Sequence, residues 1–197
     1  MRSAKRLLLV AALGFATGAA AEPARYELDP AHTTVAFLVE HIGYAKTLGQ
    51  FLRSSGGFTF DEDGGRLSEV RVVVDTSTVS THHEARDGHL RSADFLDAAE
   101  HPEMVFTAAR AERTGERTFM IAGELALLGV RRPLALEATL NKSAPYPIGE
   151  RAEVIGVSAR GTLKRSEFGM TYGVADNLVG DEVQLIIEIE APRRDRR

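Results

Sequence analysis

Apolar and polar residues alternate along much of the chain, and this alternation limits the possible folds more than any other feature of the sequence. In residues 182–190, the clearest case, Val183, Leu185, Ile187 and Ile189 alternate with glutamate or glutamine at positions 182, 184, 188 and 190. Successive side chains of a β-strand point to opposite faces, so a period of two is typical of a strand with one apolar and one polar face. We therefore predict a half-buried strand over this segment.

Further segments with strand-like patterns are residues 33–40, 49–60, 67–75, 104–112, 118–128, 133–140 and 153–164. Short stretches rich in Gly, Pro, Asp or Asn separate several of them, such as 61–65 and 141–149. Connections of this length join antiparallel strands, because a parallel pair needs a crossover of about a dozen residues or more. The sequence therefore predicts an all-β fold with eight antiparallel strands. We favour a barrel over a sandwich, since closure leaves no exposed sheet edge.

Residues 81–92 depart from the strand pattern. Thr81-His82-His83-Glu84 has the spacing of a capping box, in which a hydroxyl and a carboxylate satisfy the first turn of a helix. The segment contains only Ala85 and Leu90 as apolar residues, and Gly88 weakens a helix by about 1 kcal/mol relative to alanine. We predict a short helix that caps one end of the barrel.

The two ends of the chain differ in composition from the region between them. Arg2, Lys5 and Arg6 precede an apolar run of about ten residues and three alanines at 19–21, the pattern of a cleaved secretory signal. Such a run is short of the roughly 20 residues that cross a bilayer. We predict a signal peptide over residues 1–21, one barrel domain over 22–192 and a solvated basic tail over 193–197.

Charge and cysteine content exclude several classes of function. Without residues 1–21, the chain has 21 basic and 28 acidic residues, a net charge of −7, which is unfavourable for nucleic-acid binding. The absence of cysteine excludes disulfides, thiol nucleophiles and cysteine metal sites. Stability must therefore come from burial alone.

Two groups of residues leave catalysis open as an alternative. His82, His83 and His89 stand close together beside carboxylates and could hold zinc, although their spacing does not match the HExxH pattern. Ser158 lies in GVSARG, which is not the GxSxG sequence of a nucleophile elbow and falls within a strand pattern. A metal-dependent or serine hydrolase is the resulting alternative, while the main prediction has no catalytic residues and no metal.

The predicted apolar face carries small residues among large ones: Gly123, Ala138, Ala159 and Gly161. An eight-stranded barrel is just wide enough for its own side chains to fill it, so small inward residues leave room for a slender apolar guest. Alternatively, large neighbours occupy that room, and the protein is a packed structural or stress-response module without a ligand. Composition leaves both possibilities open.

Short motifs appear in a fixed order along nearly the whole chain after residue 25. They are YELD at 26–29, HT at 32–33, VEH at 39–41, GQF at 49–51, RDGHLRSADF at 86–95, HP at 101–102, Phe106, GEL at 123–125, GVRRP at 129–133, RSEFG at 165–169 and VGDEV at 179–183. In this combination and order, the chain resembles the YceI-like family of exported polyisoprenoid-binding proteins.

The resemblance implies a lipocalin-like antiparallel barrel whose interior holds the chain of an isoprenoid lipid, such as a quinone or another prenyl lipid. It also implies binding or carriage in the periplasm rather than catalysis, often as a homodimer. Transient contact with a membrane is expected of such a carrier, and no cofactor is expected besides the lipid.

On this basis we predict a ligand site inside the barrel, with a polar corner at its end. The expected wall residues are Phe37, Val39, Val72, Val74, Phe106, Val157, Gly161, Leu163 and Phe168. Leu90 and Phe95 are expected to turn inward, while Arg86 and Asp87 pair with each other or with backbone to hold the corner. His41 and His89 are candidates for contacting the polar headgroup of the lipid.

Overall fold

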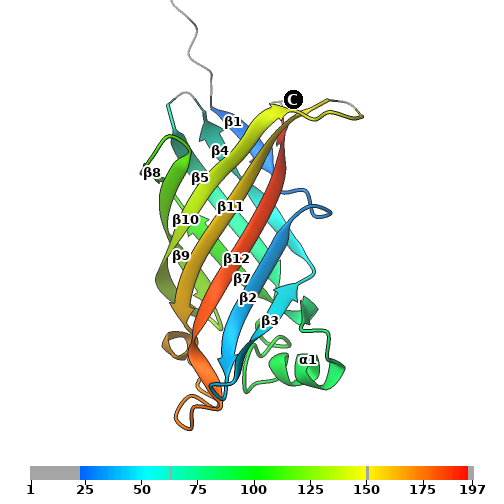
Figure 1. The fold of residues 1–197 in the computed structure, drawn as a ribbon, viewed down its shortest axis with the longest axis vertical. Coiled ribbons are helices and arrows are strands. Elements are labelled where there is room, and N and C mark those ends of the chain that lie inside the picture. Colours follow the sequence, from blue (N-terminus) through cyan, green and yellow to red (C-terminus); the bar gives the residue numbers. More distant parts are fainter. Residues whose placement is uncertain (1–22, 63, 150, 195–197) are drawn as a thin grey trace, which may run out of the picture.

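A single antiparallel sheet of 12 strands forms the wall of the molecule and closes on itself (Figure 1). The computed structural model describes residues 23–62, 64–149 and 151–194. Its strands are β1 (Ala24–Glu27), β2 (Thr34–His41), β3 (Ala45–Phe51), β4 (Ser54–Asp61), β5 (Arg66–Asp75), β6 (Val79–Ser80), β7 (Glu103–Ala108), β8 (Glu112–Arg113), β9 (Thr118–Leu127), β10 (Val130–Pro145), β11 (Glu153–Lys164) and β12 (Val179–Arg194). The helical elements are α1 (Glu84–Leu90) and two 3-10 turns, η1 (Thr76–Thr78) and η2 (Arg165–Phe168).

The closed ring consists of eight strands in the order β1, β4, β5, β7, β9, β10, β11 and β12, and β12 pairs with β1 to complete it. Strand β12 is long enough to serve two partners on one edge. It pairs with β2 through residues 179–188 and with β1 through residues 193–194, while β11 occupies its other edge. The predicted all-β, eight-stranded antiparallel barrel is confirmed.

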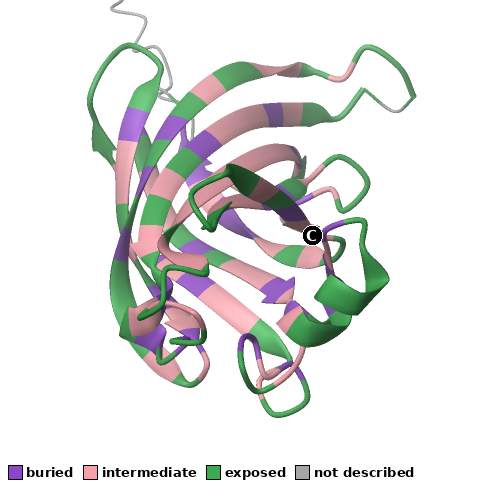
Figure 2. Ribbon diagram, turned by 60° about the horizontal axis from the view of Figure 1, so that its bottom comes forward, coloured by how far each residue is buried: buried purple, intermediate pink, exposed green. Residues whose placement is uncertain are grey.

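Alternation along the strands separates an apolar interior from a polar exterior. In β10, Leu134, Leu136 and Ala138 are 7%, 6% and 5% exposed, whereas the intervening Ala135 and Glu137 are exposed. Figure 2 shows the same succession of buried and exposed residues along neighbouring strands of the wall. The hydrophobic core is therefore the interior of the barrel.

The predicted single strand over residues 49–60 was wrong, because this segment contains a bend. Strand β3 pairs with β2 and β6, whereas β4 pairs with β1 and β5. At the bend between them, the N–H groups of Leu52 and Arg53 each donate to Thr78 Oγ1 at 3.2 Å, and the Arg53 side chain binds Asp75. These partners lie more than 20 residues away, so a local pattern could not reveal the break.

Helix α1 lies at one end of the barrel, at the bottom of Figure 1, which we call the α1 end. The predicted cap was misplaced by two residues. His83 is the N-cap, and its Nδ1 accepts from the Arg86 N–H at 3.2 Å. The Thr81 hydroxyl instead donates to Asp87 Oδ1 at 2.6 Å.

Arg86 and Asp87 meet at Thr81 rather than pairing with each other in a salt bridge. Asp87 Oδ1 also accepts from the Thr81 N–H at 2.7 Å, and Arg86 donates to the Thr81 hydroxyl at 2.7 Å and to its carbonyl at 2.9 Å. Burial alone would raise the pKa of Asp87, but the hydrogen bonds from Thr81 and the charges of Arg86 and Arg91 outweigh it and lower that pKa. The network fixes the chain between β6 and α1.

The structure moves the predicted boundary between the barrel and the basic tail, which the sequence analysis placed after residue 192. Strand β12 continues through Arg194, and Arg194 Nε lies 2.9 Å from Glu27 Oε2, so Arg193 and Arg194 belong to the barrel rather than to a tail. The predicted signal peptide over residues 1–21 lies outside the described residues. No helix in the described ranges is long and apolar enough to cross a membrane.

Candidate ligand-binding cavity

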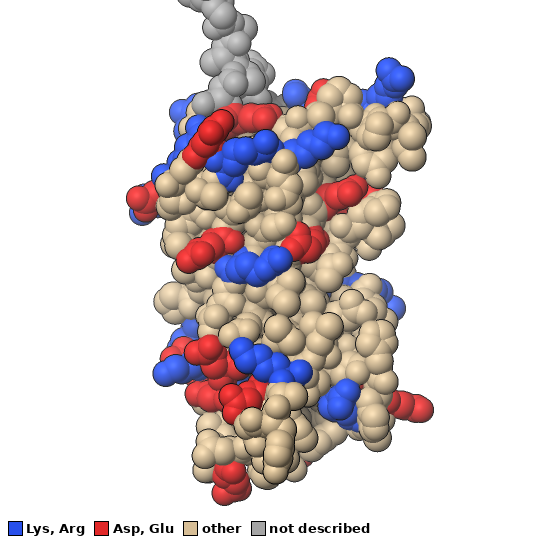
Figure 3. Space-filling model, viewed as in Figure 1, with Lys and Arg blue, Asp and Glu red and all other residues tan. Residues whose placement is uncertain are grey.

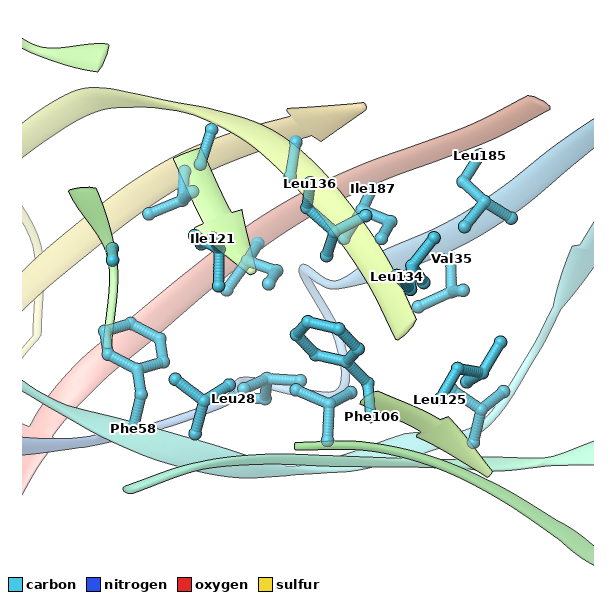
Figure 4. A pocket seen from close by; sticks show the side chains of 18 of the residues that line it. Leu28, Val35, Phe58, Phe106, Ile121, Leu125, Leu134, Leu136, Leu185 and Ile187 are labelled. Carbon is cyan, nitrogen blue, oxygen red and sulfur yellow. The ribbon is translucent and has the colours of Figure 1, made fainter. Parts of the chain in front are cut away.

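An apolar cavity of about 160 Å³ occupies the middle and upper part of the barrel. Figure 4 shows that side chains from strands on opposite sides of the ring, including Phe106, Leu136 and Ile187, point into it. Every side chain that lines the cavity is apolar. These side chains therefore offer no hydrogen bond to a bound guest, and recognition along this wall depends on shape and the hydrophobic effect.

Six of the predicted wall residues line this cavity: Phe37, Val72, Val74, Phe106, Val157 and Leu163. They come from β2, β5, β7 and β11, so the closure of the ring brings together positions that are far apart in the sequence. In each case an apolar residue of a predicted alternating strand faces inward.

A second apolar cavity of about 100 Å³ lies at the α1 end. Val39, Leu90 and Phe95, which were predicted to face a ligand, contribute to its lining. Phe37, Phe51, Met104, Leu163 and Leu185 line both cavities. These five side chains therefore stand between the two spaces and divide the interior into two chambers.

The small residues of the interior do not all contribute open space. A Cβ at Gly161 would lie 2.7 Å from Leu136 Cδ2, and one at Gly123 would lie 2.4 Å from Phe106 Cζ. Large neighbours therefore cover both glycines, as the packed alternative expected. Ala138 and Ala159, in contrast, line the upper cavity.

Four predicted site residues lie outside the linings of these two cavities: Gly161, described above, and Phe168, His41 and His89. Phe168 of η2 is 3% exposed and belongs to the hydrophobic core, but it does not line either cavity. His41 is an exposed residue at the end of β2. His89 is exposed as well, and its ring packs edge-on against Phe95 and Tyr172 at 5.0 and 4.9 Å between centroids, while its Nε2 lies 3.0 Å from Asp94 Oδ2. Phe95 thus stands between His89 and the lower cavity.

The sequence analysis missed Arg165, whose buried guanidinium closes the α1 end. Its side chain is 2% exposed and donates to the carbonyls of Met170, Tyr172, Val179 and Gly180 at 2.7–2.9 Å. These carbonyls belong to the loop that runs from η2 into β12, so Arg165 binds this loop at four points. Met170 and Val179 of the same region line the lower cavity. Arg165 is the first residue of the RSEFG motif, one of the motifs that carried the family resemblance. Nothing in the sequence, however, indicated that its charged side chain would be buried.

Ser158, the candidate nucleophile of the catalytic alternative, is hydrogen-bonded to side chains of the two neighbouring strands. The Ser158 hydroxyl donates to Glu188 and accepts from Asn141 at 2.8 Å. Burial would raise the pKa of Glu188, but hydrogen bonds from Ser158 and Arg160 outweigh it and lower that pKa, which makes the carboxylate a weak base. Within the described ranges, no group of three or more His, Asp or Glu residues is arranged to hold a metal ion.

Comparison with known proteins agrees with this architecture. A model of the YceI-like domain matches residues 26–191. This chain belongs to the YceI-like family. Among curated members of the YceI-like family, a UPF0312 protein of Pectobacterium carotovorum is 35% identical over 188 residues, which cover 95% of each chain. The protein YceI of Salmonella arizonae is 37% identical over 183 residues, which cover 92% of this chain and 93% of that one.

Solved structures of other proteins share the barrel. The YCEI protein of Campylobacter jejuni superposes with a TM-score of 0.71 at 29% identity, covering 79% of this chain and 90% of that one. A polyisoprenoid binding domain from Saccharophagus degradans superposes with a TM-score of 0.65 at 16% identity, covering 88% of this chain and all of that one. At 16% identity, the comparison with the Saccharophagus degradans domain shows a similarity of fold alone.

Proposed function

We propose that this YceI-like protein binds the chain of an isoprenoid lipid inside the barrel and carries it between membranes or membrane proteins. The observation that carries the proposal is the wholly apolar lining of the interior cavity. The fold shared with a polyisoprenoid binding domain from Saccharophagus degradans supports the choice of ligand class.

The physical need for such a carrier follows from the hydrophobic effect. Exposing an apolar chain to water costs about 0.8 kcal/mol for each CH₂-sized group. An isoprene unit has five carbons, so each unit left in water would cost roughly 4 kcal/mol. An apolar barrel removes this cost, and exchange with a membrane is then close to neutral because both environments shelter the tail.

The size of the cavity adds a condition to the proposal. Apolar cavities of about 150 Å³ in other proteins stay dry and bind benzene, so the upper chamber of about 160 Å³ has room for roughly one isoprene unit. A longer chain requires the side chains between the two chambers to change rotamer. Met104 has an unbranched, flexible side chain and is well suited to such a movement.

The finer parts of the proposal concern location and ligand. The protein acts in the periplasm after removal of residues 1–21, touches a membrane only transiently and carries a quinone or a related prenyl lipid without chemical change. A homodimer is part of the same proposal. The apolar interior and the engaged Ser158 hydroxyl support binding rather than hydrolysis.

The test is to purify the protein from a host that exports it and to identify its bound lipid by native mass spectrometry followed by solvent extraction. We expect one long-chain isoprenoid per barrel. Delipidated protein should then take up an isoprenoid quinone, whereas an unrelated exported β-protein purified in parallel should not. Folded protein that contains no lipid and takes up none would refute the proposal.

A further inference from the structure

The end of the barrel opposite α1 lies at the top of Figure 1. There, the strand positions that continue the inward face carry polar residues. Ile155, Val157 and Ala159 of β11 line the upper cavity, so Glu153, two residues before Ile155, begins the same face. In β12, Ile187 and Ile189 line the cavity and Ala191 is completely buried, so Arg193 continues that face. The apolar wall therefore ends in charged residues on both strands.

A third strand contributes a hydroxyl to this rim through an irregularity in its pairing. In β10, the register with β11 shifts between Leu140 and Lys142, which places Ser143 opposite Ile155. The Ser143 hydroxyl donates to Glu62 Oε2 at 2.8 Å. Glu62 follows β4, and three strands separate β4 from β10 in either direction around the ring. This hydrogen bond therefore joins opposite sides of the mouth.

Tyr26 lies where the apolar wall meets this rim. It is 5% exposed, its ring stacks on Phe58 of the upper cavity at 5.7 Å between centroids, and its partner in the register is Arg193. Burial raises the pKa of the Tyr26 phenol, Arg193 opposes this rise, and Glu62 and Glu153 add to it. Tyr26, Glu62, Ser143, Glu153 and Arg193 thus act on one region, which we call the mouth cluster. Figure 3 shows acidic and basic side chains together along this upper rim.

The α1 end offers less to a polar group. The Arg165 guanidinium already binds four backbone carbonyls, and the remaining side chains that line the lower cavity are apolar. His89 lies behind Phe95. A lipid with a polar head is therefore accommodated best with its tail toward α1 and its head at the mouth cluster.

We propose that the mouth cluster binds the headgroup of the isoprenoid and selects a neutral, hydrogen-bonding head, such as an alcohol, phenol or quinone, over a phosphate. The inference rests on the proposed function and adds the orientation of the lipid and the basis of its selection. The carboxylates of Glu62 and Glu153 accept a hydrogen bond from a hydroxyl, while the Tyr26 phenol and the Arg193 guanidinium can donate to a hydroxyl or carbonyl oxygen. Two carboxylates and one guanidinium give a net negative site, and like charges placed together oppose binding of a phosphate.

The experiment compares a polyprenol with the polyprenyl phosphate of the same chain length, using delipidated protein and equilibrium binding. Wild type is expected to bind the polyprenol at least about tenfold more tightly than the phosphate. The double variant Glu62→Gln, Glu153→Gln is expected to reduce this preference to about twofold, because both like charges are removed. A matched control, Glu137→Gln with Glu182→Gln, removes two carboxylates from exposed positions of β10 and β12 and should keep the wild-type preference.

A second variant tests the Tyr26 hydroxyl of the mouth cluster without changing the charge of the site. Tyr26→Phe retains the ring stack on Phe58 and should weaken polyprenol binding roughly fivefold, the effect of losing one hydrogen bond of about 1 kcal/mol. Circular dichroism and thermal unfolding establish that each variant folds.

The outcomes separate this inference from the proposed function. If both lipids bind wild type equally well and the charge variants change neither affinity, lipid binding stands and the headgroup assignment is wrong. If His89→Ala weakens polyprenol binding while the mouth variants do not, the head lies at the α1 end and the orientation is wrong. If folded wild type binds neither lipid, the proposed function fails and the headgroup site fails with it.

Discussion

Replacing Ala138 by leucine would place a larger side chain in the upper cavity and tests whether a ligand occupies that space. Ala138 is 5% exposed and lines the cavity of about 160 Å³. Leucine adds three carbon atoms, which displace the same number of ligand carbons. At about 0.8 kcal/mol for each buried CH₂, binding should lose about 2.4 kcal/mol, or roughly 50-fold in Kd.

The stability of the lipid-free protein should change much less. Filling an empty apolar space gains up to about the same 2.4 kcal/mol, while overpacking a core costs about 1–3 kcal/mol. We therefore expect the free energy of unfolding of delipidated Ala138→Leu to stay within about 1 kcal/mol of wild type. Position 161 is less suitable, because a side chain there would meet Leu136 and the carbonyl of Ala135 at 3.0 Å or less.

The assay is uptake of an isoprenoid quinone by delipidated protein, followed by native mass spectrometry across a range of lipid concentrations. Ala135→Leu is the matched control, since it makes the same change on the exposed face of the same strand. Its Kd should stay within about twofold of wild type, because that side chain points away from the ligand. A folded Ala138→Leu variant with wild-type affinity would show that the ligand does not use the upper chamber.

Two further predictions concern the closure of the α1 end. Arg165→Met removes the donors to four carbonyls and should lower the free energy of unfolding by more than about 3 kcal/mol in urea denaturation, with faster hydrogen exchange in residues 170–180. A loss below about 1 kcal/mol would contradict the role given to this arginine. Asp87→Asn should cost about 1–3 kcal/mol at pH 7. Because the pKa of Asp87 is lower in the folded state than its value of about 3.9 in the unfolded chain, this carboxylate stabilises the fold above pH 4 and stops doing so as the pH falls through the folded pKa. The difference between wild type and Asp87→Asn should therefore shrink below pH 4, and a difference that is constant from pH 7 to pH 3 would exclude this linkage.

Local alternation was sufficient to predict most of the barrel wall. Residues such as Val157 and Leu163 face inward because each strand of a closed sheet has one dry side, and this property is visible in the sequence. The bend at Leu52 and Arg53 was not predictable in this way, since Thr78 and Asp75 determine it from a distant part of the chain.

The open space of the interior was harder to predict than its polarity. Glycines at 123 and 161 suggested room, but Phe106 and Leu136 from adjacent strands cover them. Whether a small residue leaves a void depends on the rotamers of its cross-strand neighbours, which a single strand does not specify.

The polar mouth could have been found from the sequence. Continuing the inward period of β11 and β12 to their ends reaches Glu153 and Arg193, but Arg193 had been assigned to a tail because of its basic neighbours. Ser143 required the structure, because the shift in register after Leu140 changes the face on which it lies.

The partners of β12 also determine the order in which this protein can fold. The final residues of β12 pair with β1, the first strand of the barrel. The hydrogen-bonded residues Arg194 and Glu27 are separated by 167 positions in the sequence. Contacts between such distant residues form slowly, commonly in milliseconds to seconds. Until the C-terminal segment has been synthesised and has docked, β1 and β2 lack their shared neighbour, and the future interior remains accessible to water, chaperones and free lipid.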